Sequence, residues 1–342
     1  MAYSTIDDPS AHFQTTLYSG TGSTASVTNG GNSDLQPDWV WIKARNATRD
    51  HRLLDSTRGV QKELVSNSNA AEYTESTGLT AFQSDGFQHG GANGYGASGE
   101  NYVSWQWKAN GGTTSTNDDG SVDVTIQVNS TAGFSIMKWN GNGGTSGTVG
   151  HGLGAIPDMI LNKYGIDGTS NWGVAFPKFE TGKLIVLNDN SNGFQSASGM
   201  SSYNTSTFVD GNGASTGGTV AYCFKEIKGY SRFGFYVGNG DANGPMCYTG
   251  FKPAFVMIKR TNGSGNWMMF DSKRDPRNAV DDYVVAHATQ VEAEYDFIDF
   301  LSNGFKQRHT SSHANGDGDT YVYMAFADKP WVTSKGVVTT AV

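Results

Sequence analysis

Apolar and polar residues alternate in short runs along this chain. Residues 102–107, 219–224 and 321–326 each place bulky side chains on every second position, Trp105 and Trp107 among them. A period of two is that of a β-strand, whose successive side chains point to opposite faces of the sheet. Gly, Ser, Thr and Asn separate these runs, and such residues favour tight turns. The pattern therefore predicts a β-rich chain.

Two landmarks recur three times. The first is an aromatic residue two positions before Gly-x-Gly, at Tyr18/Gly20/Gly22, Trp139/Gly141/Gly143 and Tyr236/Gly238/Gly240. The second is a proline that opens an apolar run, at Pro37, Pro157 and Pro253. We interpret the glycines as a turn that needs positive φ, and the proline as the first residue of the next strand, where no amide donor is required.

A third landmark occurs in two of the three segments. Asp55 and Asp271 each begin an Asp-Ser pair that follows the proline at the same distance, and the middle segment lacks this pair. We predict an all-β chain of three related antiparallel β-sandwich-like modules in tandem. The expected parts are an arm (1–11), module one (12–108), a linker with one strand (109–132), module two (133–228), module three (229–330) and a tail (331–342). Two short helices are expected, at 60–72 and 285–295.

Charge and cysteine content narrow the function. The net charge of −8 argues against nucleic acid as a partner, because nucleic-acid binders gather Lys and Arg. No apolar run is long enough to span a membrane and no secretory leader is evident, so we expect synthesis in a cytoplasm. Cys223 and Cys247 lie among apolar residues and are expected to be buried thiols, with a disulfide as the alternative.

Candidate chemistry is sparse, and we expect neither a catalytic residue nor a cofactor. His309 and His313 have helical metal-site spacing but lie in a polar loop without the required Glu. The Gly-x-Ser-x-Gly match at 213–217 is followed by a strand where a hydrolase needs a helix. The oxygen-rich loops at 118–119 and 317–319 are expected to be Asx turns and not metal sites, with bound Ca²⁺ as the alternative.

Two sets of residues stay open between structural and functional roles. Asp55 and Asp271 could form the carboxylate pair of a glycosidase, but their recurrence favours a structural role, such as ion pairs with Arg58 and Arg274. Five aromatic residues beside polar turns could stack on glycans or pack at an interface, but burial in an aromatic core is favoured for each of them. These are Tyr95, Trp139, Trp172, Tyr203 and Trp267.

Long motifs in this chain resemble repeated modules of structural and tail-fibre-like virion proteins of marine tailed bacteriophages, including cyanophages. They lie at 37–45 with 50–59, at 131–157 and at 229–259. The resemblance implies a virion protein, made in the host cytoplasm, with a lectin-like or SPRY-like sandwich fold. We expect a fibre or adhesin that contacts the host surface, with capsid decoration as the alternative and glycan cleavage as the least favoured. The expected partners are other virion proteins, further copies of the chain and a host glycan.

Overall fold

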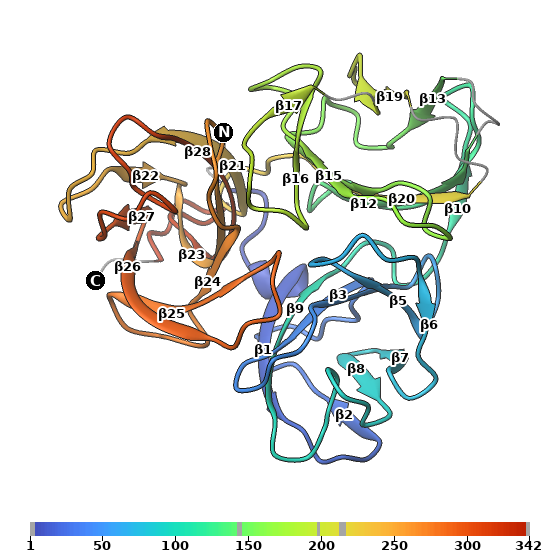
Figure 1. The fold of residues 1–342 in the computed structure, drawn as a ribbon, viewed down its shortest axis with the longest axis horizontal. Helices are drawn as coiled ribbons and strands as arrows, with labels where there is room; N and C mark the ends of the chain where they lie inside the picture. Colours follow the sequence, from blue (N-terminus) through green and yellow to red (C-terminus); the bar gives the residue numbers. More distant parts are fainter. Residues whose placement is uncertain (1–3, 142–145, 197–198, 212–216, 340–342) are drawn as a thin grey trace.

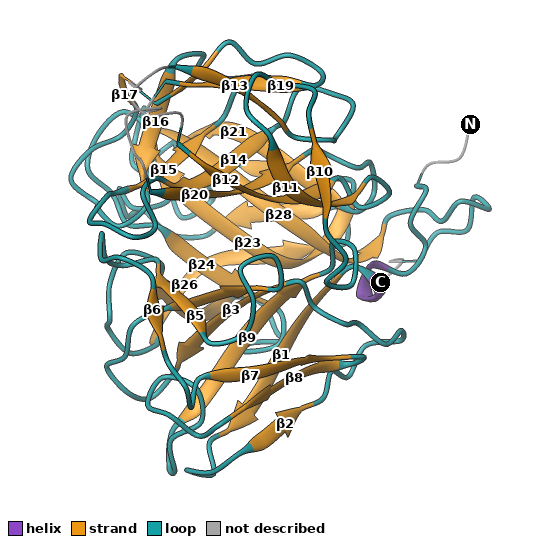
Figure 2. Ribbon diagram, turned by 90° about the vertical axis from the view of Figure 1, so that its right-hand side faces the viewer, coloured by secondary structure: helices purple, strands orange, loops and turns teal. Residues whose placement is uncertain are grey.

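Three lobes of β-sheet lie around a common centre in the computed structural model (Figure 1), which describes all residues except 1–3, 142–145, 197–198, 212–216 and 340–342. The only helix in the described part is the single 3-10 turn η1 (Pro9–Ala11). No helix there is long and apolar enough to cross a membrane. The predicted all-β, antiparallel class is confirmed, and Figure 2 shows strands stacked through the whole depth of the molecule.

The three large sheets share one order over six strands, which the second sheet extends at its beginning and the third at its end. The first contains, in spatial order, β1 (Phe13–Ser19), β9 (Asn101–Trp107), β3 (Trp39–Ala44), β4 (Arg52–Asp55), β5 (Lys62–Val65) and β6 (Tyr73–Thr74). The second contains β10 (Ser115–Asn117), β11 (Val124–Asn129), β12 (Phe134–Asn140), β20 (Gly218–Phe224), β14 (Met159–Lys163), β15 (Trp172–Ala175), β16 (Lys183–Val186) and β17 (Gln195–Ser196). The third contains β21 (Ser231–Val237), β28 (Thr320–Pro330), β23 (Phe251–Arg260), β24 (Met268–Asp271), β25 (Val280–Val285), β26 (Ala293–Leu301), β27 (Gly304–Gln307) and β22 (Met246–Tyr248).

Two smaller sheets lie on the outer side of the first and middle segments. They are formed by β2 (Ala25–Val27), β8 (Gly86–His89) and β7 (Leu79–Gln83), and by β13 (Gly147–Gly150), β19 (Thr207–Asp210) and β18 (Met200–Ser201). In each segment the strand after the proline pairs with the closing strand, as in Trp39↔Trp107 and Met159↔Phe224. The shared strand order agrees with the tandem repeat inferred from sequence, which stays a prediction.

One hydrophobic core joins the three large sheets. Alternate residues of β3 divide between two cores, because Trp39 and Trp41 face the centre whereas Val40 and Ile42 face the outer side of their own segment. The strands β14 and β23 divide in the same way. At the centre, the ring centroids of Trp107 and Phe224 lie 5.6 and 5.8 Å from that of Phe326. A strand buried on both faces is apolar throughout, which explains the continuous runs after the prolines.

Several local predictions require correction. The helices expected at 60–72 and 285–295 are wrong, because these segments contain β5 and the adjoining ends of β25 and β26. Their apolar residues pair with neighbouring strands, and this tertiary pairing overrides a short helical pattern. The stretch expected to be a linker with one strand contributes two, β10 and β11, which extend the middle sheet beyond β12. Cys223 and Cys247 are free, buried thiols, as predicted.

The landmark residues have distinct roles. Gly22 and Gly240 have φ of 73° and 63°, so the second glycine of the pattern takes the left-handed conformation. Gly20 and Gly238 are needed for close approach, since a Cβ would lie 2.1 and 2.3 Å from the backbone oxygens of Ala97 and Gly316. Gly141 is the last described residue before residues 142–145, and Gly143 lies outside the described residues. Pro37 and Pro157 precede their strands, but Pro253 lies inside β23 at a register shift.

Candidate functional site at the junctions of the three sheets

A buried ion pair lies at the end of β4 in the first sheet. Asp55 is the last residue of β4, and the Arg58 Nε donates to its Oδ2 at 2.5 Å with both side chains fully buried. Arg58 also donates to Glu72 Oε2 at 3.0 Å and to the carbonyls of Leu53 and Lys62 at 3.1 and 2.9 Å. Burial lowers the pKa of Arg58, but the nearby Asp55, Tyr222 and Glu72 outweigh it and raise the pKa above its ordinary value. The guanidinium is therefore charged, and two carboxylates and two backbone carbonyls accept its hydrogen bonds.

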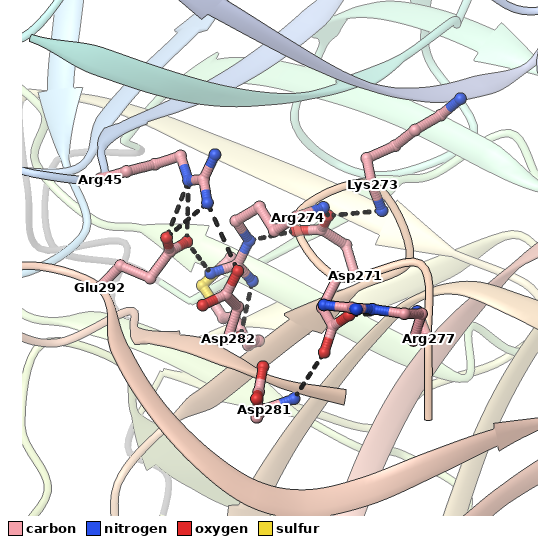
Figure 3. Close-up of polar contacts among 10 residues, drawn as sticks. Arg45, Asp271, Lys273, Arg274, Arg277, Asp281, Asp282 and Glu292 are labelled. Carbon is pink, nitrogen blue, oxygen red and sulfur yellow. Dashed lines mark hydrogen bonds and ion pairs between the residues drawn. The ribbon is translucent and has the colours of Figure 1, made fainter. Parts of the chain in front are cut away.

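The last sheet contains the same arrangement (Figure 3). Arg274 Nε donates to Asp271 Oδ2 at 2.5 Å, and its Nη1 donates to Glu292 Oε2 at 3.1 Å. Arg45 of the first segment reaches across to Glu292 at 2.6 Å and to Asp282 at 3.4 Å. Burial and the neighbouring Glu292 raise the pKa of Asp282 to about 6. The ionic network thus spans the junction between the last and first segments.

Each buried aspartate also accepts a hydrogen bond from the neighbouring segment. The Tyr222 hydroxyl donates to Asp55 Oδ2 at 2.8 Å, and Trp105 Nε1 donates to Asp271 Oδ2 at 3.1 Å. The Arg274 guanidinium lies 5.5 Å from the centre of the Trp105 ring, within the range of a cation–π contact. Both carboxylates are fully buried and hydrogen-bonded to protein atoms, an arrangement that fits the structural role favoured from the sequence.

The third junction replaces these charges with phenylalanine rings. Phe176, the residue after β15, is equivalent to Asp55, the last residue of β4, because β14 and β15 pair as Ile160↔Ala175 and β3 and β4 as Val40↔Leu54. Phe179, three residues later, stands where Arg58 stands, and its ring centroid lies 6.4 Å from that of Phe176. Phe194 donates its backbone N–H to Thr261, as Glu72 does to Ile166 and Glu292 does to Arg45. The third junction therefore has phenylalanine at all three positions that are Asp, Arg and Glu at the other two junctions.

At each of two junctions, a tryptophan ring nitrogen donates a hydrogen bond to a backbone carbonyl of the neighbouring segment. Trp172 Nε1 donates to Val65 O at 2.8 Å, and Trp267 Nε1 donates to Val186 O at 2.9 Å. His51 takes this place in the first segment, where its Nδ1 accepts from Trp41 Nε1 at 2.9 Å. Burial lowers the pKa of His51 well below its ordinary value, and the Val285 carbonyl acts in the opposite direction. The imidazole is thus neutral at physiological pH.

One lysine in each segment is buried beside a junction. Lys43 donates to Arg49 O at 2.7 Å and to Thr289 O at 3.0 Å, and Lys163 donates to Ser170 O and to Asn69 O. Lys259 donates to Gly265 O at 2.7 Å. Burial lowers the pKa of each ammonium group to about 8. Each lysine stands six residues after the landmark proline, a recurrence that the sequence displays and that identifies a shared structural position.

The five aromatic candidates are mostly inside the molecule. Tyr95, Trp139, Trp172 and Trp267 are buried, and their polar atoms have protein partners: Tyr95 donates to Glu63 and Trp139 donates to Asp210. Tyr203 is only partly buried and packs on the outer core of the middle segment. The first four rings therefore belong to cores, the role favoured from the sequence, because strand pairing encloses the polar turns beside them. Trp172 and Trp267 lie at interfaces within the chain.

The remaining candidate sites stay dispersed. Within the described ranges, no group of three or more His, Cys, Asp or Glu residues is close enough to hold a metal ion. His309 contacts the rings of Tyr295 and Phe297, and His313 accepts from the Asn266 amide, so the two imidazoles have separate partners. The Gly-x-Ser-x-Gly match falls outside the described residues except for Gly217.

The chain belongs to the family described as Domain of unknown function (DUF7483), whose match covers residues 8–330 and so includes all three sheets. No curated protein and no solved structure matches the chain.

Proposed function

We propose that this member of the DUF7483 family is a structural component of a bacteriophage virion, a fibre or adhesin that contacts the host surface and carries out no chemistry. The proposal rests mainly on one observation: the acidic and basic side chains at the junctions are buried and bonded to other protein groups. Asp55, Arg58, Asp271 and Arg274 are fully buried and hydrogen-bonded to protein atoms, where they hold three sheets in one body. An enzyme would need such groups at a site open to substrate.

The resemblance to marine phage structural proteins supports the virion assignment. A shared aromatic core with ionic links across its junctions supports a rigid body, as expected for a part that bears load outside a cell. Loops join the strands on the outer side of all three lobes (Figure 1), and loops on a rigid scaffold are common recognition elements.

Capsid decoration is the second candidate. One observation favours it: the described residues form a compact three-lobed body, and this part of the chain includes no coiled-coil or β-helical shaft. A short fibre tip has the same property, so the two candidates differ in their place on the particle and not in fold.

Blocking of adsorption tests the adhesin assignment. Fab fragments raised against the purified chain are incubated with phage particles of the type that encodes it, and unadsorbed phage are counted after host cells are added. If the chain is an adhesin, the specific Fab should slow adsorption relative to an unrelated Fab. Unchanged adsorption with confirmed Fab binding to particles would favour decoration, and absence of the chain from purified particles would contradict the virion assignment.

A further inference from the structure

An open aromatic groove lies between the middle and last segments, at the junction that lacks the ionic network. It encloses about 500 Å³ and is lined by Phe179 and Phe194 of the middle segment and by Phe235 of β21. At the other two junctions the residues equivalent to Phe179 are Arg58 and Arg274, and each pairs with a carboxylate. The replacement of Arg by Phe therefore removes a charge network and leaves a hollow with apolar walls.

Two rings form an exposed platform in this groove. Phe179 and Phe235 are stacked, with centroids 6.4 Å apart and an interplanar angle of 29°. They are 40% and 49% exposed, which is high for side chains of this size. Phe235 is open because β21 is the edge strand of its sheet, whereas β11 covers the equivalent strand β12 in the middle sheet. An exposed apolar patch with a polar rim indicates a binding site.

The rim of the groove carries neutral hydrogen-bonding groups. Asn262 Oδ1 accepts from Arg260 Nε at 3.1 Å and from the Thr320 amide at 3.3 Å, which leaves its amide nitrogen as a donor. The Thr261 and Thr320 hydroxyls, 2.6 Å apart, add a donor and acceptors. Glu180 and Lys183 pair at 3.0 Å, so the charges that line the groove cancel.

These features select the chemical class of the ligand. The volume is that of a small-molecule site, and a flat aromatic platform beside a few fixed polar groups suits a ligand with one apolar face and polar edges. A balanced pair of charges favours a neutral ligand over an anion or a cation. A hexose ring has this character, because its C–H groups form an apolar face and its hydroxyls lie around the edge.

We infer that the groove formed by Phe179, Phe194 and Phe235 binds a neutral hexose unit of a surface polysaccharide. The inference deepens the proposed function and rests on it for its biological setting, because a host-binding adhesin needs such a ligand. Phe179 and Phe235 stack against the sugar face, and Asn262 hydrogen-bonds to a hydroxyl at its edge. None of the five aromatic residues singled out in the sequence belongs to this site.

Saturation-transfer NMR tests the inference with defined probes: glucose, galactose, mannose, N-acetylglucosamine and their common disaccharides. The variants Phe235→Ser and Phe179→Ser remove one ring each from partly exposed positions. The control is Tyr73→Ser, which removes an aromatic side chain that is 61% exposed on β6, in the first sheet. Thermal melting confirms that each variant is folded.

The inference predicts transfer to the ring protons of at least one sugar, with affinity reduced about tenfold or more in both Phe variants and unchanged in the control. Transfer that persists in the Phe variants would place the sugar elsewhere and overturn the inference. Absence of transfer to every probe would also overturn it, while a positive Fab result would leave the proposed function standing. Dimerisation in sedimentation that Phe235→Ser abolishes would identify a second copy as the occupant instead. If the chain binds a sugar but is missing from purified particles, the sugar-binding inference stands and the virion role is contradicted.

Discussion

Replacement of Arg58 by leucine tests how strongly a buried ion pair beside a junction stabilises the protein. The Arg58 side chain is fully buried and donates to two carboxylates and two backbone carbonyls. Leucine removes all of these donors and leaves the Asp55 carboxylate buried, with only Tyr222 and a backbone amide as donors.

The expected cost follows from this unpaired charge. Removing one partner of a buried pair typically destabilises a protein by about 3–5 kcal/mol, because the other charge remains without compensation. We expect Arg58→Leu to lower the free energy of unfolding by about 4 kcal/mol. The double change Asp55→Leu with Arg58→Leu should cost less than the single change, since it removes both charges, as Phe176 and Phe179 do at the third junction.

Urea denaturation followed by tryptophan fluorescence measures these differences. The matched control is Arg308→Leu, whose arginine is 43% exposed and pairs with Asp299 at 3.2 Å. An exposed pair contributes at most ~1 kcal/mol, so this variant should unfold almost as the parent does. If Arg58→Leu lowers the free energy of unfolding by no more than Arg308→Leu does, the buried pair is no stronger than an exposed one and the prediction is wrong. It is also wrong if the Asp55→Leu, Arg58→Leu double variant is less stable than Arg58→Leu alone.

Three further results are expected. Trp172→Phe, which removes the indole donor to Val65 O across a junction, should lower the free energy of unfolding by about 1–3 kcal/mol in urea. Burial lowers the pKa of Lys163 in the folded state to about 8, so the unfolded chain binds more protons above that pH. Stability should therefore rise from about pH 8 toward the ordinary lysine pKa near 10.4, and rise less steeply in Lys163→Met, as denaturation at pH 7.5 and 10 will show. Burial raises the pKa of the Cys223 and Cys247 thiols, so a thiol reagent should react slowly with the native chain. Both cysteines should react fast once urea unfolds the chain, and fast reaction in the native state would contradict their burial.

Local signals in the sequence predicted the strands well. Alternation identified β9, β20 and β28, because every second residue of each strand is a bulky side chain that enters the central core. The two expected helices failed because short apolar runs do not distinguish a helix from a strand, and strand partners at 73–74 and 293–298 decided the outcome.

The junctions could be predicted only in part. The ion pairs Asp55–Arg58 and Asp271–Arg274 were foreseen as one structural possibility, since both residues of each pair lie in the same short turn. The contacts of Tyr222, Trp105 and Arg45 with these pairs were not, because they join residues more than 160 positions apart in the chain. The aromatic groove was missed for the same reason: Phe179 and Phe235 meet only after the middle and last segments pack together.

Cryo-electron microscopy of purified phage particles tests the proposed function most directly. We expect a three-lobed density that fits this chain at the tail or at the end of a fibre, with the groove of Phe179 and Phe235 accessible from outside. Density distributed over the capsid would contradict the adhesin role in favour of decoration, and particles that lack the chain would contradict the virion assignment itself.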